Sequence, residues 1–367
     1  MNRCRNKKSL HDDFYPTDDK EAQNAQQPQL ALGRLMQLAS VAGISGREDD
    51  VGKLVQEQLQ PYVDDIHVDA MGNVIGLRKG KKPMLMLEAH MDEVGFMVQS
   101  VDAGGYVQFL PVGPIWEPPV VGQRMHLHTS TSRIDGIVGY KQGSSSVDYG
   151  DMYLDTGLGG EEAEGLIKVG DAITFRDGVT TLANGLLAGK AMDNRVSVFV
   201  LLEVARQLAK VNLTRAVAFC FSVRHEVGAL GIPAIVTALE PDQAIVFDVA
   251  LASDYPHGIE GRLGESDLNK GPVLWRGVDL SEAMAMCLER IADEEDIDIQ
   301  RAAWNRFTPT NASHVMKVGP AVRTSLISIP HRYPHGPNSV VAQRDIANLI
   351  DLLRASISSR ELMGCAN

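Results

Sequence analysis

A histidine and an aspartate two residues apart, His90 and Asp92, follow an apolar run in the segment MLMLEAHMD. Residues 84–88 carry mostly large apolar side chains, which predicts a buried strand that ends just before His90. Alternate side chains of an extended segment point the same way, so this imidazole and carboxylate can address one metal centre. In open α/β sheets, ligands bind at the carboxyl ends of the strands. We therefore expect a site at His90 and Asp92.

Further imidazoles and carboxylates stand directly after later predicted strands or at the start of a predicted helix. They are Asp193, His225, Glu226, Asp248, His331 and His335. Two imidazoles and three carboxylates can hold two divalent ions about 3.5–4 Å apart when one carboxylate bridges them. Such a pair of ions lowers the pKa of a bound water and polarises a carbonyl oxygen, as amide hydrolysis requires.

Each of these residues also has an ordinary structural explanation. Asp193 is suited to cap a helix, Asp248 to cap a strand end, and Glu226 to favour a helix start. His126 and His128 share one face of a predicted strand and resemble a ligand pair. No carboxylate cluster accompanies them in the sequence, so we expect ordinary strand histidines.

The elements that must position these residues predict an α/β protein. Residues 1–28 are polar and predict a disordered tail. Helical and strand patterns alternate in residues 29–94 and 186–367, which we expect to form the catalytic domain in two parts. The sequence SGRE at residues 45–48 predicts a capping box that starts a helix. Short strands broken by glycine and proline in residues 95–185 predict an inserted all-β domain.

Composition limits the class of protein. A chain of 367 residues with 44% apolar residues can bury a large core, and a net charge of −12 argues against a nucleic-acid or anionic-membrane surface. No stretch is long and apolar enough for a membrane span, and no apolar segment follows the basic start, so we expect no secretory signal. The four cysteines lack metal-ligand spacing, which predicts free thiols in a reducing compartment.

The chain resembles the dinuclear-metal aminopeptidases of peptidase family M42 in five segments, which read EAHMDEVGFMV, GKAMDNRVSVFVLLE, HEVGALG, FDVALASDYP and IPHRYPHGP. The resemblance covers residues 30–355. It implies a zinc-peptidase-like mixed sheet flanked by helices, whose inserted β domain drives dimerisation, with dodecamers common in the family. It also implies a cytoplasmic homo-oligomer that removes amino-terminal residues from short peptides, with no nucleic-acid or membrane partner.

The resemblance implies two divalent ions per subunit, zinc or cobalt. Their protein ligands are expected to be His90, Asp193, Glu226, Asp248 and His335. In this arrangement Asp193 bridges the ions, and Asp92 orients His90, a role that metal-bound imidazoles usually require.

Three positions depart from the family pattern. His225 replaces the glutamate that takes a proton from the metal-bound water, residues 308–311 read TPTN in place of Gly-Gly-Thr-Asp, and Ser339 replaces a glutamate. An imidazole with an ordinary pKa near 6.5 suits proton transfer at neutral pH, so His225 is expected to be the proton acceptor; contact with a metal is the other role open to it. The alternative to an active enzyme is a weakened or inactive relative with an assembly or regulatory role. Hydrolysis of glycosidic bonds, which needs two carboxylates rather than metals, is least favoured.

Overall fold

The computed structural model describes residues 30–115, 118–143, 148–256, 264, 266–318 and 321–365. The predicted tail, residues 1–28, and Cys4 lie outside the described residues. Within the described residues, no helix is both long and apolar enough to cross a membrane.

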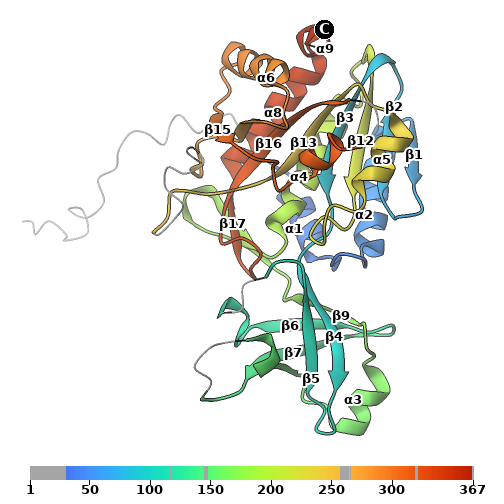
Figure 1. Cartoon of the computed structure of the whole chain (residues 1–367), viewed down its shortest axis with the longest axis vertical. Coiled ribbons are helices and arrows are strands. Elements are labelled where there is room, and N and C mark those ends of the chain that lie inside the picture. The colour runs from blue at the N-terminus through green and yellow to red at the C-terminus, as the bar shows by residue number, and fades with distance from the viewer. Residues whose placement is uncertain are drawn as a thin grey trace, which may run out of the picture. The chain divides into compact units, whose positions relative to one another are not determined.

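A mixed sheet of 11 strands forms the main layer (Figure 1). Its strands follow the order β1-β2-β12-β3-β13-β16-β17-β11-β10, and β14 and β15 extend it beside β16. Their bounds are β1 (Asp65–Val68), β2 (Val74–Arg78), β3 (Lys81–His90), β10 (Val179–Thr181), β11 (Leu186–Gly189), β12 (Arg215–Ser222), β13 (Gln243–Leu251), β14 (Val273–Gly277), β15 (Gln300–Trp304), β16 (Arg323–Arg332) and β17 (Ser339–Ala342).

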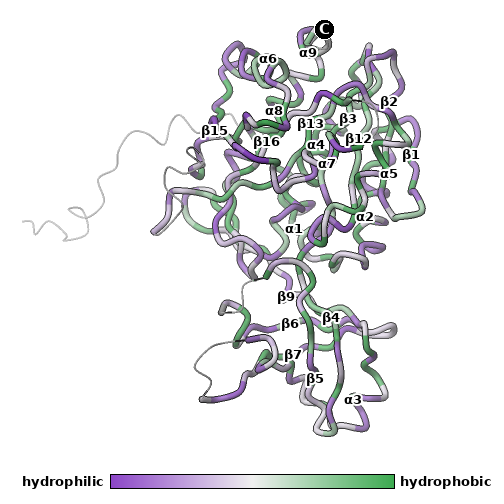
Figure 2. Tube along the Cα trace, in the orientation of Figure 1, coloured by the Kyte–Doolittle hydropathy of each residue, from purple (hydrophilic) through white to green (hydrophobic). Residues whose placement is uncertain are grey.

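Four parallel strands, β12, β3, β13 and β16, form the middle of this sheet. Their side chains are buried almost continuously, as expected for parallel strands covered on both faces. Figure 2 shows apolar residues gathered on these central strands and on the helix α4 (Met192–Leu208), which packs against them. In the register, Ser222 lies opposite His90, and Asp248 lies opposite Ser328. The carboxyl ends of these strands therefore meet at one edge of the sheet.

Helices cover both faces of the sheet. The longest, α4, is buried on nearly every side, because it packs on β3 and β13 and is itself covered by α1, α2 and α8. Helices α5 and α7 pack together against the other face, on β12, β13 and β16. The helix bounds are α1 (Leu32–Ser40), α2 (Asp49–Leu59), α4 (Met192–Leu208), α5 (Ile232–Leu239), α6 (Glu282–Glu294), α7 (Asn311–Val315), α8 (Gln343–Ser358) and α9 (Arg360–Gly364).

The chain between β3 and β10 forms a closed barrel in the order β4-β5-β8-β7-β6-β9. Three phenylalanines, Phe96, Phe109 and Phe175, meet edge to face in its separate core. Sequence periodicity predicts most of these strands but misses β4 and the short helix α3. The bounds are β4 (Gly95–Val101), β5 (Val107–Val112), β6 (Arg124–His128), β7 (Arg133–Tyr140), β8 (Met152–Asp155), α3 (Gly160–Leu166) and β9 (Ala172–Phe175). Because β10 pairs with β11, the chain rejoins the large sheet before the expected boundary at residue 185.

The predicted capping box at the start of α2 is wrong. Glu48 is the N-cap residue, but its side chain makes no capping hydrogen bond. Instead, Glu48 Oε1 accepts hydrogen bonds from the backbone N–H groups of Gly46 and Arg224, and the Ser45 hydroxyl donates to Asp92. These side chains hold the segment that follows β12 rather than their own helix.

The prediction of free thiols is wrong for two of the four cysteines. Cys287 and Cys365 form a disulfide across 78 residues, because α9 packs on α6 and brings them together. Cys220 is a free, buried thiol.

A buried ion pair links the segment that leads from β3 into the barrel to the segment between β11 and α4. Lys190 Nζ donates to both carboxylate oxygens of Glu93 at 2.8 Å, and both side chains are at most 2% exposed. The backbone N–H of Gly43 also donates to Glu93, and Arg195 Nη2 lies 3.6 Å from it. The Glu93 carboxylate is thus compensated by three neighbouring groups in the protein interior.

We expect Lys190→Met to lower the free energy of unfolding by about 3–5 kcal/mol, because it leaves the Glu93 charge buried without its main partner. Urea unfolding monitored by circular dichroism measures the change. The matched control is Lys53→Met, which removes the exposed ion pair to Asp50 at 3.1 Å and should cost less than about 1 kcal/mol. Equal effects of the two substitutions would contradict this account.

Candidate metal centre

The predicted site residues meet at the edge where the parallel strands end. His90 is the last residue of β3, Asp248 lies in β13, and Asp193 lies at the start of α4. His225 and Glu226 follow β12, and His335 follows β16. A cavity of about 490 Å³ opens over them. Residues that are far apart in the sequence thus surround one space.

Asp193 lies between two imidazoles. Its Oδ1 is 3.3 Å from His90 Nε2, and its Oδ2 is 3.2 Å from His335 Nε2. A second carboxylate stands beside each histidine: Asp248 Oδ1 is 3.8 Å from His90 Nε2, and Glu226 Oε2 is 3.7 Å from His335 Nε2. The arrangement therefore has two halves that share the Asp193 carboxylate.

Several polar atoms of this cluster are buried without a hydrogen-bond partner. They are both ring nitrogens of His90, Oδ1 of Asp193 and Oε1 of Glu226. Buried polar atoms in proteins are almost always paired, so such a group of unpaired atoms points to a missing partner. Candidate ligand atoms of His90, Asp193 and Glu226 lie within 4.8 Å of one another, as do those of His90, His225 and Asp248. Imidazole nitrogens and carboxylate oxygens suit zinc and similar divalent ions, so the residues present fit such ions.

Asp92 supports the cluster from behind. Its Oδ1 lies 3.4 Å from His90 Nδ1, on the side of the ring away from Asp193. The same carboxylate accepts hydrogen bonds from the backbone N–H groups of His225 and Glu226, both at 3.0 Å, and from the Ser45 hydroxyl at 2.5 Å. Burial raises the pKa of Asp92, but His90 outweighs this effect and the pKa is lowered. One ionised carboxylate thus orients His90 and fixes the segment that carries Glu226.

Without bound ions, the cluster holds protons tightly. Burial lowers the pKa of His335, but the Asp193 and Glu226 carboxylates outweigh it and raise the pKa to about 9. Burial, reinforced by the Asp193 charge, raises the pKa of Glu226 to about 8. Protons therefore neutralise part of the charge that divalent ions would otherwise balance.

His225 stands against His90 with the ring centroids 4.0 Å apart and the planes at 21°. Its Nδ1 lies 2.8 Å from Asn311 Oδ1, and its Nε2 lies 3.9 Å from Asp248 Oδ2. Burial, followed by the His90 charge, lowers the pKa of His225. The ring is thus a neutral imidazole at the wall of the cavity.

Asn311 determines which nitrogen of His225 carries the proton. Its Nδ2 donates to Glu88 Oε1 at 2.8 Å and to Ser222 Oγ at 3.0 Å, so its Oδ1 must face His225. The Nδ1 of His225 therefore donates, which leaves the lone pair of Nε2 directed toward Asp248.

Sequence reasoning missed the supporting residues behind the site. It treated Asn311 only as a lost carboxylate, and it passed over Glu88, a fully buried carboxyl whose pKa burial raises to about 7. The available signal was a glutamate within an otherwise apolar strand. Ser339, the third departure, donates from its hydroxyl to the Tyr333 carbonyl and holds the loop that carries His335.

Two other histidines named from the sequence, His331 and His126, take other roles. His331 is buried, with Nδ1 3.1 Å from the Ala250 carbonyl, and it lines the cavity beside the cluster. In the barrel, His126 is held between Asp135 and Asp177 at 2.6 and 2.7 Å, although no carboxylate cluster accompanies it in the sequence. Both carboxylates come from residues that flank it only after folding. Both His126 nitrogens are thus occupied by the protein.

Comparison with known proteins places this fold among the metal-dependent aminopeptidases. The TET aminopeptidase of Thaumarchaeota archaeon SCGC AB-539-E09 superposes with a TM-score of 0.85 and 28% identity, covering 91% of this chain and 98% of that one. The Pyrococcus horikoshii TET1 peptidase superposes with a TM-score of 0.80 and 25% identity, covering 88% and 98%. The lysyl aminopeptidase of Pyrococcus furiosus is 28% identical over 88% of this chain and 95% of its own length.

The sequence model described as M42 glutamyl aminopeptidase matches residues 72–352. The chain belongs to this family of aminopeptidases, which confirms the resemblance seen in the sequence.

We expect the ion-free protein to lose stability as the pH rises from about 6 to about 9. The pKa of His335 is raised to about 9, so its stabilising contribution is complete below its ordinary pKa of 6.5 and disappears as pH rises through 9. The pKa of Glu226 is raised to about 8 from an ordinary 4.5, so ionising it over this range also destabilises the fold. Urea unfolding in a chelator at several pH values measures the trend.

A double variant, Glu226→Gln with His335→Gln, is the control for this trend and should show a flatter dependence on pH. Saturating zinc should reverse the trend in the parent protein, because ion binding needs deprotonated ligands and strengthens as pH rises. A parent protein whose ion-free stability is constant from pH 6 to 9 would refute the raised pKa values of His335 and Glu226.

Proposed function

We propose that this protein is a two-metal aminopeptidase that hydrolyses amino-terminal residues from short peptides. One observation carries the proposal: the two oxygens of Asp193 face different histidines, and a further carboxylate stands beside each histidine. Membership of an aminopeptidase family supports it. His90, Asp193 and Asp248 hold one ion in this proposal, and Asp193, Glu226 and His335 hold the other.

Two bound divalent ions, zinc or cobalt, would supply a water of lowered pKa and polarise the scissile carbonyl. The chain contributes the proton transfer. In the proposal, Nε2 of His225 accepts a proton from the attacking water. This nitrogen is free to accept it, because Asn311 holds the ring hydrogen on Nδ1. The resulting imidazolium is stabilised by Asp248 and gives the proton to the departing amine. The free amino group of the peptide is held, in this proposal, by the metal site or by neighbouring carboxylates.

The alternative is a catalytically weakened or inactive family member with an assembly or regulatory role. It is favoured by the lowered pKa of His225, since a weaker base accepts a proton less readily. Activity measured with metal occupancy established decides between the two.

The proposal extends to assembly as a homo-oligomer built from dimers. The Pyrococcus horikoshii TET1 peptidase is described as assembling into a tetrahedron or an octahedral shell. The barrel of this chain exposes large apolar side chains that a partner subunit would cover, and we propose the barrel as the dimerisation domain. They are Tyr106, Leu110, Ile137 and Tyr140. A cytoplasmic location is proposed with it, on the family resemblance alone.

We expect Asp193→Asn to lower both metal content and peptidase activity, the latter by at least about a hundredfold, because the shared carboxylate is lost. Elemental analysis should find close to two ions per chain in the parent protein and fewer in the variant. Chelation should abolish activity, and zinc or cobalt should restore it. The control is Asp177→Asn in the barrel, which should keep both ions and full activity.

Release of product from none of a panel of aminoacyl chromophores, with two ions per chain measured in the same sample, would overturn the enzyme proposal. That outcome would support the inactive alternative.

We expect His225→Glu to lower kcat by at least about tenfold. The new carboxylate would face Asn311 Oδ1 and the Asp248 carboxylate, so it would lose the hydrogen bond that positions the present base. The control, His67→Glu on the exposed side of β1, makes the same change of charge away from the site. A large gain in activity would show instead that histidine is an impaired base.

A further inference from the structure

A second, smaller cavity adjoins the metal centre. It measures about 130 Å³ and shares four lining residues with the larger cavity over the ion ligands. The shared residues are Val249, Leu251, Pro309 and Thr310. Val249 directly follows the proposed ligand Asp248, so the small cavity lies beside the cluster.

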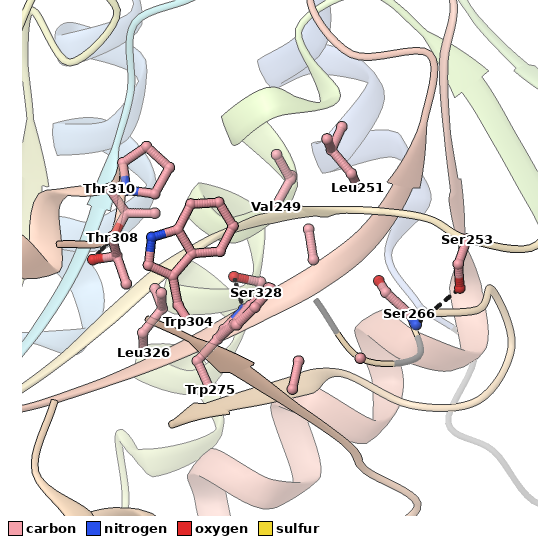
Figure 3. Close-up of a pocket in the computed structure, with 14 residues that line it drawn as sticks. Val249, Leu251, Ser253, Ser266, Trp275, Trp304, Thr308, Thr310, Leu326 and Ser328 are labelled. Atoms are coloured by element: carbon pink, nitrogen blue, oxygen red, sulfur yellow. Dashed lines mark hydrogen bonds between the residues drawn. The ribbon is translucent and has the colours of Figure 1, made fainter. Parts of the chain in front are cut away.

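The walls of this cavity are mainly apolar. Figure 3 shows the indole of Trp304 between Val249 and the side chains of Trp275 and Leu326, which all line the cavity. The two indoles meet edge to face, 6.2 Å apart. Trp275 Nε1 donates to Ser328 Oγ, and Trp304 Nε1 donates to the Phe307 carbonyl. With their N–H groups occupied, both rings present apolar surface.

The polar groups of the cavity are neutral. The Thr310 hydroxyl donates to Thr308 Oγ1, which in turn donates to Asp279. Ser253 Oγ accepts from the Ser266 backbone N–H, as Figure 3 shows. Among the described residues that line the cavity, none is charged. A charged side chain would therefore lose its water there without gaining a counter-charge, which is strongly unfavourable.

We propose that this cavity receives the side chain of the substrate's amino-terminal residue and selects leucine, methionine or phenylalanine. The inference rests on the proposed aminopeptidase function. An apolar cavity of about 150 Å³ holds a benzene molecule, so about 130 Å³ suits a side chain of this size. The cavity prefers apolar side chains over alanine, which leaves it unfilled, and over glutamate and lysine, which carry charge.

The test compares kcat/KM of the zinc- or cobalt-loaded protein for aminoacyl chromophores of leucine, methionine, phenylalanine, alanine, glutamate and lysine. We expect kcat/KM for the leucine, methionine and phenylalanine substrates to exceed that for the alanine substrate by at least about tenfold. The excess over the glutamate and lysine substrates should be larger still. A preference for glutamate or lysine, or equal rates for leucine and alanine, overturns the proposal while leaving the aminopeptidase function intact.

Filling the cavity should abolish this selectivity. Ala302, on β15, is buried and lines the cavity, so Ala302→Ile should reduce the leucine-to-alanine ratio about tenfold while activity on alanine persists. Ala303→Ile is the matched control, because Ala303 is the next residue of the same strand and is exposed. It should keep the parent ratio. An unchanged ratio in folded Ala302→Ile protein refutes the proposal. If the isoleucine variant does not fold, the smaller substitution Ala302→Val is tested in its place.

Binding provides a measurement that does not depend on turnover. If the metal-loaded protein cleaves none of the substrates, the proposed function fails, and calorimetry with L-leucinamide and L-alaninamide still tests the cavity. We expect leucinamide to bind at least about tenfold more tightly, and Ala302→Ile to remove the difference. Equal binding of the two amides by the parent protein refutes the proposal.

Discussion

The site depends on the cost of burying charged and polar groups away from water. Three carboxylates and two imidazoles lie within a few ångströms at the end of the central strands, and several of their atoms have no hydrogen-bond partner in the protein. Such groups are stable together only when protons or cations balance them. The rest of the fold supplies what this arrangement requires: the strands β3 and β12 that end level, a buried helix whose first turn carries Asp193, and a carboxylate, Asp92, that fixes two segments at once.

The family resemblance implies that His225 stands where relatives have a glutamate, and His225 has a matching environment. Asn311, a second departure implied by the resemblance, contacts His225 directly and is held by Glu88 and Ser222. The two departures therefore belong to one hydrogen-bonded unit. A histidine placed there without Asn311 would have no neighbour fixing its tautomer, so the pair is better understood as one altered feature than as two separate losses.

Much of the fold and of the cluster could be predicted because both leave local signals. His90 and Asp248 interrupt or end apolar runs, and Asp193 lies at the start of a long, mostly apolar helix, so each stands out in the sequence. Asn311 and Glu88 could not be paired in this way, since they lie 223 residues apart and meet only through the order of the strands. The role of the Ser45 hydroxyl was predicted wrongly for a similar reason. Its local sequence pattern suits a helix cap, but the hydroxyl instead donates a hydrogen bond to the distant Asp92. The disulfide was missed because cysteine spacing carries no information about how α9 packs on α6.

The ion pair between Glu93 and Lys190 holds the large sheet together at the base of the inserted barrel. It links the segment that leads into the insertion, just before β4, to the segment just before α4, 97 residues later, after the chain has rejoined the large sheet through β10 and β11. Closing a longer segment between fixed ends adds only about 0.6 kcal/mol for each doubling of its length. Relatives can therefore lengthen, shorten or reshape the inserted chain, and with it the surface offered to neighbouring subunits, while the strand ends that carry the chemistry stay in register.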